Sequence, residues 1–120
     1  MSNHLDIGLA GEQYACTHLL KDGYTIIEKN WRYKRAEIDI ICTKGQHLIF
    51  VEVKTRTSGY MGEPSAAVTR AKQKHIVRAA DAYVKEYEGD PEVRFDIIGI
   101  IMNNKEKTLE HIEDAFYPTL

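Results

Sequence analysis

The spacing of apolar residues changes along the chain, and each spacing predicts a different element. Three short stretches rich in β-branched and apolar residues follow one another, at Thr25 to Trp31, Glu37 to Thr43 and Leu48 to Lys54. Apolar residues then recur at helical spacing between about Thr69 and Tyr87, at Ile76, Ala79, Ala80, Tyr83, Val84 and Tyr87. Because side chains repeat every second residue in a strand and every 3.6 residues in a helix, we predict three strands followed by a helix.

Cap and turn residues predict the other elements. Asp6 is a suitable cap for a helix from about Ile7 to Lys21, which Gly23 would end. Residues 55–65 contain two glycines and a proline and predict a loop. Residues 94–102 predict a strand, residues 103–107 a turn, and residues 108–112 a short edge strand. The order αβββαββ predicts an α/β sandwich of three layers, with a central mixed sheet flanked by helices.

Length and composition indicate one small globular domain. The 120 residues are 43% hydrophobic and 28% charged, which fits a single domain over residues 1–120. No apolar run has membrane-spanning length, and the polar N-terminus lacks a signal segment, so we expect a cytoplasmic protein without a membrane partner. The two cysteines and five histidines show neither CxxC nor HExxH spacing, so we predict no zinc site.

The net charge of −2 conceals an uneven distribution. Residues 29–78 hold eleven bases and four acids, whereas the segments before and after them are acidic. A basic middle segment favours an electropositive face that binds an anionic partner such as nucleic acid. The alternative is an ordinary mixed-charge surface in contact with solvent.

The second and third predicted strands form a hairpin that brings ionisable residues together. Glu37 and Asp39 share one face of the first strand, as do Glu52 and Lys54 of the second. The opposite face is aliphatic and is predicted to be core, at Ile38, Ile40, Ile49, Val51 and Val53. A turn at residues 44–47 places Asp39 opposite Glu52, and a two-residue turn at 44–45 shifts the pairing by two residues.

Two neighbouring carboxylates repel each other unless a cation lies between them. Oxygen ligands alone suit Mg²⁺ or Mn²⁺, which keep several waters and accept a substrate phosphate as a further ligand. Lys54 is placed to orient or deprotonate an attacking water. The alternative is a structural salt bridge of Lys54 with Glu52 or Glu37 on a solvated face.

The hairpin and its surroundings resemble a known family. Ile38-Asp39 and Val51-Glu52-Val53-Lys54, on either side of a short turn, resemble the metal-binding hairpin of PD-(D/E)XK nucleases. The chain more closely resembles the small bacterial YraN family, which comprises predicted endonucleases distantly similar to archaeal Holliday junction resolvases. The motifs that carry this resemblance are Gly8-x-x-Gly11-Glu12-x-x-Ala15, Asn30-Trp31-Arg32, Glu37-Ile38-Asp39-x-Ile41, Phe50 to Arg56, Gly62-x-Pro64, Val68 with Lys72, and Arg94-Phe95-Asp96. Ala36 stands where the family usually has glycine, and Ile38 replaces the superfamily's proline.

The resemblance implies a restriction-endonuclease-like fold and a set of site residues. Asp39, Glu52 and the Val53 carbonyl would bind Mg²⁺ or Mn²⁺, and Lys54 would position the water. Glu12 matches the acidic residue that completes the metal shell in resolvase-like members. Glu37 is either a supporting acid near the metal ligands or the partner of Lys54.

Basic residues near these motifs are candidates for contacts with nucleic acid. Aromatic and basic residues alternate around Trp31 and Tyr33, a pattern that suits phosphate contacts and base stacking, although Trp31 also fits a core position. The candidates are Arg32, Lys34, Arg35, Arg56, Arg70 and Lys72, with Arg56 at the base of the 55–65 loop, which could grip the substrate. We interpret Asp96 as a partner of Arg94 or of a loop donor rather than as a chemical group.

Two functions from different classes fit these observations. The first is a metal-dependent endonuclease acting on nucleic acid, with branched or damaged DNA as one substrate class. The second is a non-catalytic nucleic-acid-binding module with a nuclease-like fold. Because resolvases act as symmetric dimers, the resemblance also allows a homodimer.

Overall fold

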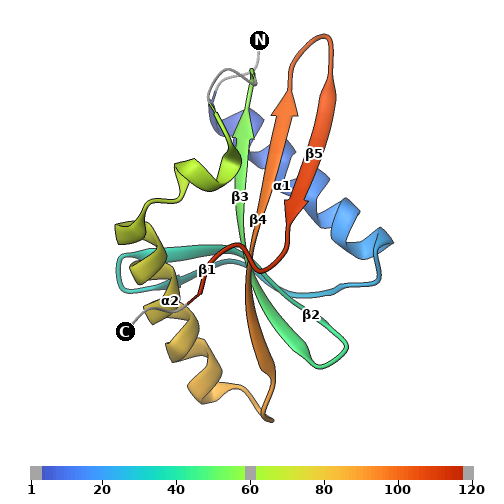
Figure 1. Cartoon of the computed structure of the whole chain (residues 1–120). Coiled ribbons are helices and arrows are strands. Elements are labelled where there is room, and N and C mark those ends of the chain that lie inside the picture. The colour runs from blue at the N-terminus through green and yellow to red at the C-terminus, as the bar shows by residue number, and fades with distance from the viewer. Residues whose placement is uncertain (1–3, 59–61, 118–120) are drawn as a thin grey trace.

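A five-stranded sheet lies between two helices in the computed structural model, which describes residues 4–58 and 62–117 (Figure 1). The elements in chain order are α1 (His4–Lys21), β1 (Thr25–Tyr33), β2 (Ala36–Lys44), β3 (His47–Arg56), a 3-10 helix (Pro64–Ala67), α2 (Arg70–Glu86), β4 (Glu92–Met102) and β5 (Lys107–Ile112). The predicted order αβββαββ is confirmed. Among the described residues, no helix is long and apolar enough to cross a membrane.

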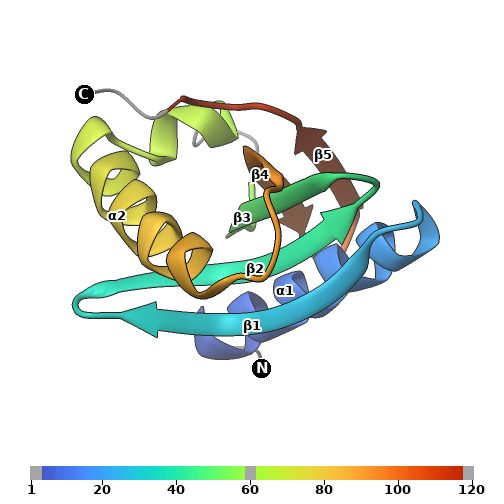
Figure 2. The same ribbon diagram turned by 90° about the horizontal axis from the view of Figure 1, so that it is seen from below.

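The sheet is mixed, and its strand order follows the chain from β1 to β5. Neighbouring strands are antiparallel except β3 and β4, which run parallel. A parallel pair needs a crossover connection, and α2 lies between these two strands in the chain. Figure 2 shows α1 and α2 on opposite faces of the sheet, which gives the predicted three layers.

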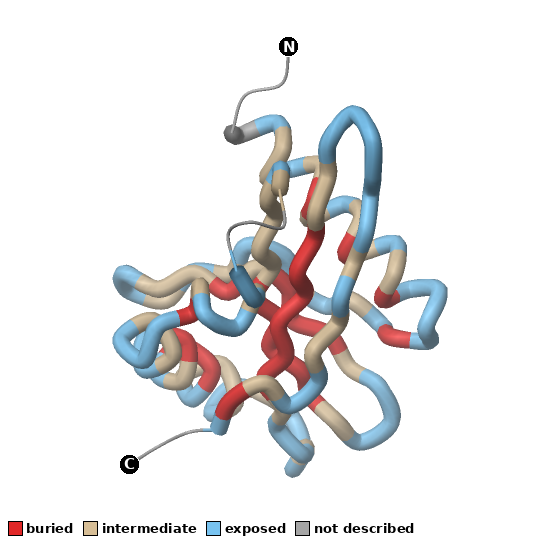
Figure 3. Tube along the Cα trace, turned by 45° about the horizontal axis from the view of Figure 1, so that its top comes forward, coloured by how far each residue is buried: buried red, intermediate tan, exposed pale blue. Residues whose placement is uncertain are grey.

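Each helix covers its own hydrophobic cluster. On the α2 face, Ile76 and Ala79 pack with Ile41 and Phe50 of the sheet. On the α1 face, Leu19 packs in a second cluster, with the sheet residues Ile40, Ile49, Val51 and Ile98. The central strands are therefore buried on both faces (Figure 3), which explains their nearly continuous apolar sequence.

The helix ends agree with the predicted signals except at the first residue of α1. This helix begins at His4, so Asp6 lies within its first turn and does not cap it as predicted. A negative charge there still complements the helix dipole. Gly23 has φ of 87°, as expected for a left-handed stop. The Thr69 side chain caps α2 by accepting a hydrogen bond from the Lys72 backbone N–H.

The hairpin adopts the first of the two predicted registers. Lys44 pairs with His47 and Thr43 with Leu48, around a turn at residues 45–46. The same register continues to Ile40 and Val51, so Asp39 and Glu52 occupy the next opposite positions. The alternative register is excluded.

One predicted face assignment is wrong, because Ile38 belongs to the α2-side cluster and not to the aliphatic face of Ile40. Strict alternation would place Ile38 with Ile40. The pairing of β1 with β2 passes over Asn30 and Asp39, and Asn30 has φ of 53°. This irregularity changes the phase of both strands, so that Trp31 and Ile38 face α2 together.

Asp96 is fully buried in β4 and is well supplied with hydrogen bonds. Arg94 donates to both of its carboxylate oxygens, at 2.9 and 2.8 Å. His111 Nε2 lies 2.7 Å from Oδ2, and the Asp114 backbone N–H donates to Oδ1 at 3.0 Å. Burial alone would raise the pKa of Asp96, but its hydrogen bonds with His111, Arg94 and Asp114 outweigh burial and hold it below the usual range. The predicted pairing with Arg94 is confirmed.

The cluster around Asp96 joins distant parts of the chain. Arg94 also donates to the Tyr24 hydroxyl at 2.7 Å, next to the start of β1, and pairs with Glu113 at 3.1 Å. His18 of α1 lies 3.3 Å from His111 of β5 through their ring nitrogens. One buried carboxylate therefore ties the last two strands to α1 and to the entry of β1.

We predict that Asp96→Asn lowers the free energy of unfolding by about 3–5 kcal/mol at pH 7, because it leaves Arg94 without its buried partner. Folding lowers the pKa of Asp96, so its contribution is present at neutral pH and is lost as the pH falls below about 4. Urea denaturation at pH 7 and at acid pH measures both effects. Asp81→Asn, at an exposed i,i+4 pair with Lys85, is the control and should cost about 0.5 kcal/mol or less. A loss below about 1 kcal/mol for Asp96→Asn would contradict the structural role.

Gly11 sets the distance between α1 and the sheet. A Cβ atom at this position would overlap the Thr55 side chain of β3, whereas one at Gly8 would meet nothing within 4 Å. We predict that Gly11→Ala destabilises the fold by about 1–3 kcal/mol through overpacking. Gly8→Ala should stabilise it by about 0.5–1 kcal/mol through helix propensity. Thermal or urea unfolding of the two variants checks this, and equal effects of both would count against the close packing.

Candidate metal-binding site

The candidate site lies where β2 and β3 separate. Within the described residues, the ladder between them ends at Ile40 and Val51. At the next step the Val53 backbone N–H donates to Asp39 Oδ2 at 2.7 Å, so a side chain replaces the backbone acceptor. β3 continues to Arg56 with β4 on its other edge. The separation opens a notch, and the backbone N–H of Val53 points toward it.

Glu52 is the buried acid of the notch, with 6% of its surface exposed. Its Oε2 atom is fully buried and accepts no hydrogen bond from the residues that the structure describes. Lys72 of α2 places its Nζ atom 3.4 Å from this oxygen, beyond a strong hydrogen bond. This buried oxygen therefore has an ammonium group beside it but no hydrogen-bond donor among the described residues, which leaves it able to bind a metal cation.

Asp39 faces Glu52 across the separated strands. Burial raises the pKa of Asp39 to about 8, assisted by a hydrogen bond with Glu52 and by the negative charge of Glu52. The hydrogen bond from Val53 and the charge of Lys72 act in the opposite direction but are weaker. The two acids are therefore close enough to share a proton. This agrees with the prediction that two neighbouring carboxylates in this hairpin would repel each other if both were charged.

Two lysines complete the α2 side of the notch. Lys54 and Lys72 interact with each other, and burial together with the Lys72 ammonium lowers the pKa of Lys54. Burial also lowers the pKa of Lys72, but the hydrogen bond with Lys54 and the charges of Glu52 and Asp39 outweigh burial and raise it. Lys54 is thus the more easily deprotonated amine, and Lys72 remains a cation beside Glu52. Lys72 was predicted to contact nucleic acid, and the structure places it among the acids.

Glu12 approaches the notch from α1. Burial and the charge of Asp39 raise the pKa of Glu12, while a hydrogen bond with Asn30 lowers it. Glu12 also lines a pocket of about 330 Å³ together with Val53 and Lys54. The described residues contain no preassembled group of three or more His, Cys, Asp or Glu side chains with metal-binding geometry. Glu12 is therefore near the pair without joining it.

The donor set at the notch nevertheless fits Mg²⁺ or Mn²⁺. These ions are bound through one or two carboxylates and keep several waters. Asp39 and Glu52 supply the carboxylates, and Glu52 Oε2, which accepts no hydrogen bond from the described residues and has the Lys72 ammonium beside it, is an available ligand atom. The N–H and C=O of one strand residue point to the same edge, so the Val53 carbonyl also faces the notch.

Comparison with known proteins identifies the family. The model of a family described as "Uncharacterised protein family UPF0102" matches residues 11–100 of the chain. The chain belongs to the UPF0102 family. A UPF0102 protein of Bacteroides thetaiotaomicron is 45% identical over 120 residues, covering 100% of this chain and 99% of the relative. One from Flavobacterium psychrophilum is 46% identical over 117 residues, covering 98% of each chain. One from Chlorobium phaeobacteroides is 47% identical over 118 residues, covering 92% of this chain and 94% of the relative.

Membership of UPF0102 confirms the resemblance to the YraN family that the motifs carry. The family is described as uncharacterised, so membership assigns no activity to the chain. The chemistry of the notch must therefore be argued from its own residues.

Glu37 lies beside the notch and does not pair with Lys54. It forms an ion pair with Arg32 at 3.0 Å across the β1–β2 ladder, which excludes the Lys54 alternative. Glu37 also lines a pocket of about 350 Å³ with Asp39, Glu52 and Lys72. Glu37 therefore lies at the rim of the notch, and its role as a supporting acid stays a prediction.

The basic residues predicted to bind nucleic acid separate into different places. Lys34 and Arg35 form the β1–β2 turn, and Arg70 is the exposed first residue of α2. Arg56 belongs to β3, so the predicted 55–65 loop begins later than expected, and its guanidinium donates to the backbone carbonyls of Gly62 and Glu63. Part of that loop, residues 59–61, lies outside the described residues, and its predicted gripping role is untested.

His75, which was not among the predicted site residues, lines the same pocket as Asp39 and Glu52. Its position three residues after Lys72 places both on one face of α2, and this spacing was the available signal. Trp31 lies at a core position, which is the second of the two placements that its sequence context allows. Its ring packs edge-on against Tyr83 at 5.1 Å, at the border of the α2-side core.

We predict that the free energy of unfolding of the metal-free protein decreases as the pH rises from about 4 to about 8, because of Asp39. Folding raises the pKa of Asp39 to about 8, so the folded state binds a proton that the unfolded chain releases in this range. Burial and the neighbouring Glu52 raise the pKa of Asp39, while the Val53 N–H and the Lys72 ammonium oppose them, and Glu12 is a further carboxyl group near Asp39. In chelator at pH 8, Asp39→Asn should melt about 5 °C or more above the wild type, and the difference should shrink at pH 5. Asp90→Asn, at an exposed site, should follow the wild type, and parallel pH profiles for all three proteins would contradict the prediction.

Proposed function

We propose that this UPF0102 protein is a metal-dependent nuclease that hydrolyses phosphodiester bonds in nucleic acid, with DNA as the expected substrate. One observation carries the proposal: Asp39 and the buried Glu52 oxygen converge at a break in the sheet, beside two lysines. Burying two acids at such close range is costly unless a cation joins them. Their contacts give this pair no structural role comparable with that of Asp96.

The residues at the notch suggest a division of roles. Asp39, Glu52 and the Val53 carbonyl would hold Mg²⁺ or Mn²⁺, and Glu12, which the family motif includes, would complete the metal shell from α1. When bound, such an ion polarises a phosphate oxygen and acidifies a coordinated water. Lys54, with its lowered pKa, would accept a proton from the attacking water or orient that water. Lys72 stays positively charged and would stabilise negative charge on the phosphate.

The second candidate is a nucleic-acid-binding module with this fold and no turnover. One observation favours it, since three metal ligands are not preassembled among the described residues. Metal binding and cleavage separate the two candidates. In both cases a cytoplasmic protein is expected, and the homodimer implied by the resolvase resemblance stays a prediction that analytical ultracentrifugation of the full chain tests.

We predict metal-dependent cleavage of at least one substrate in a labelled panel of four-way junction, flap, single strand, duplex and structured RNA. Asp39→Asn, Glu52→Gln and Lys54→Ala should each reduce the rate by on the order of 10²-fold or more. Glu106→Gln, an exposed carboxylate in the turn after β4, should retain the full rate. Chelator should abolish cleavage. Activity that survives all three substitutions indicates a contaminant and would contradict the assignment.

We also predict that Mn²⁺ or Mg²⁺ stabilises the wild type by mass action, by about 2.7 kcal/mol at a hundred times its dissociation constant. Asp39→Asn and Glu52→Gln should lose this stabilisation, and Glu106→Gln should keep it. Calorimetric titration and thermal unfolding with and without the ion measure the effect. Nucleic-acid binding without any metal response would favour the binding module instead.

A further inference from the structure

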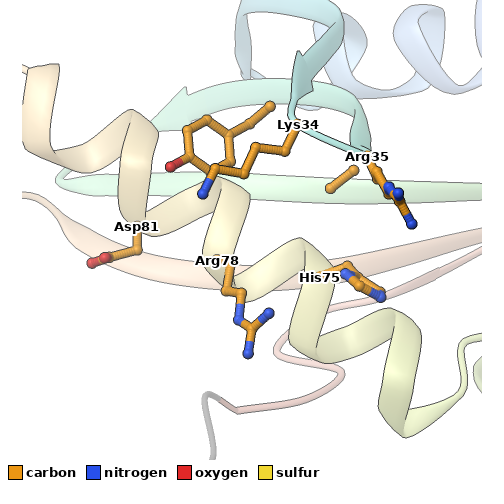
Figure 4. A pocket seen from close by; sticks show the side chains of 7 residues that line it. Lys34, Arg35, His75, Arg78 and Asp81 are labelled. Carbon is orange, nitrogen blue, oxygen red and sulfur yellow. The ribbon is translucent and has the colours of Figure 1, made fainter.

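A second pocket adjoins the candidate metal site, between the β1–β2 turn and α2. It has a volume of about 360 Å³ and is lined by Tyr33, Lys34, Arg35, Ala36, His75, Arg78 and Asp81 (Figure 4). Arg35, Ala36 and His75 also line the pocket that contains Asp39 and Glu52. The two pockets therefore form one continuous groove, which we call the α2 groove. A small-molecule site of this size accommodates a ligand no larger than about a nucleotide.

The pocket at the far end of the α2 groove is electropositive. Lys34, Arg35 and Arg78 are exposed, and none of the three forms an ion pair with a residue that the structure describes. The one acid in the lining, Asp81, pairs with Lys85 at 3.3 Å and points away from Arg35 and His75 (Figure 4). Cations that protein acids leave unpaired are available to a phosphate.

The same pocket contains an aromatic ring that is held in place from behind. Tyr33 stacks on Trp31 with ring centroids 6.2 Å apart and planes 7° from parallel. Trp31 is in turn fixed against Tyr83 of α2. The Lys34 ammonium lies over the Tyr33 ring, 5.4 Å from its centroid, so a base that stacks on the ring there would displace this exposed, flexible side chain. A rigid aromatic surface beside unpaired cations suits a base and its phosphate together.

The turn that forms one wall of this pocket has a lysine at a position where glycine would be less strained. Tyr33 pairs with Ala36, so Lys34 and Arg35 are the two turn residues. Lys34 has φ of 56°, a conformation that favours glycine in such turns. The side chains of both turn residues line the pocket.

We propose that the far pocket of the α2 groove binds one unpaired nucleotide of the substrate strand, with its base against Tyr33 and its phosphate on Arg35 and Arg78. This inference rests on the proposed function and adds its substrate class: nucleic acid with a single-stranded segment next to the cleaved bond. In a continuous duplex each base is stacked between its neighbours and cannot offer a face to Tyr33.

The test is a binding measurement in chelator, so it does not depend on cleavage. Fluorescence anisotropy compares a labelled single strand, the same sequence as a duplex, and an abasic strand of equal length. The wild type should bind the single strand more tightly than either of the others. Tyr33→Leu, which keeps an apolar side chain in the cluster, should weaken single-strand binding about tenfold, to the level of the abasic strand. Tyr33→Phe should retain it.

The cations are tested by the dependence of affinity on salt. Arg35→Ala with Arg78→Ala should weaken binding of both the single strand and the abasic strand, and should reduce the slope of log affinity against log salt by about 0.7, the value for one neutralised phosphate. Tyr117→Ala and Lys105→Ala, an exposed aromatic and an exposed cation outside the groove, should change neither affinity. Thermal unfolding of every variant verifies that it is folded.

The outcomes distinguish this inference from the proposed function. Equal affinity for duplex and single strand, or an unchanged affinity in folded Tyr33→Leu, would overturn the nucleotide pocket while leaving the nuclease intact. The expected binding pattern without cleavage in the substrate panel would support the pocket and contradict the nuclease. Equal binding of abasic and normal strands would reduce the pocket to a phosphate contact and overturn the inference.

Discussion

Beyond Ile40 and Val51, strands β2 and β3 no longer share backbone hydrogen bonds, and the Asp39 carboxylate accepts the Val53 N–H in their place. Everything at the candidate site follows from this substitution of a side chain for a backbone acceptor. It fixes one acid at the edge of β3, directly beside the buried Glu52. It also leaves the edge of β3 open from that point, so that groups from both helices, Lys72 and Glu12, approach the same notch.

Asp39 and Asp96 show that burial alone does not determine the state of an acid. Both lie on inner strands, and burial pushes the pKa of each upward. Asp96 receives donors from Arg94, His111 and Asp114, and these reverse the effect. Asp39 accepts a hydrogen bond from one backbone N–H and faces another carboxylate, so its pKa remains raised. The first arrangement holds the fold together, and the second leaves an electrostatic conflict that is typical of functional sites.

Local patterns in the sequence were enough to predict the element order and the pair of acids, and to limit the hairpin to two registers. Each of these depends on residues close in the chain, where period and turn chemistry decide the outcome. The position of Ile38 was predicted wrongly because an irregularity at Asn30, on the neighbouring strand, changes the phase of β2. The contacts of Lys72 with Glu52 and of His111 with Asp96 depend on how α2 and β5 dock. No local pattern encodes that docking, although helical spacing from Lys72 could have pointed to His75.

The close contact of Gly11 with Thr55 has a consequence for how this site can change. Glu12 follows Gly11 in α1, so its reach toward the notch is set by the absence of a side chain on its neighbour. The combined size of the residues at positions 11 and 55 therefore determines how closely α1 packs against the sheet. A larger residue at one requires a smaller residue at the other, and an unmatched exchange would displace the Glu12 carboxylate from the notch. Libraries built to alter the chemistry of Glu12 should vary these two positions together.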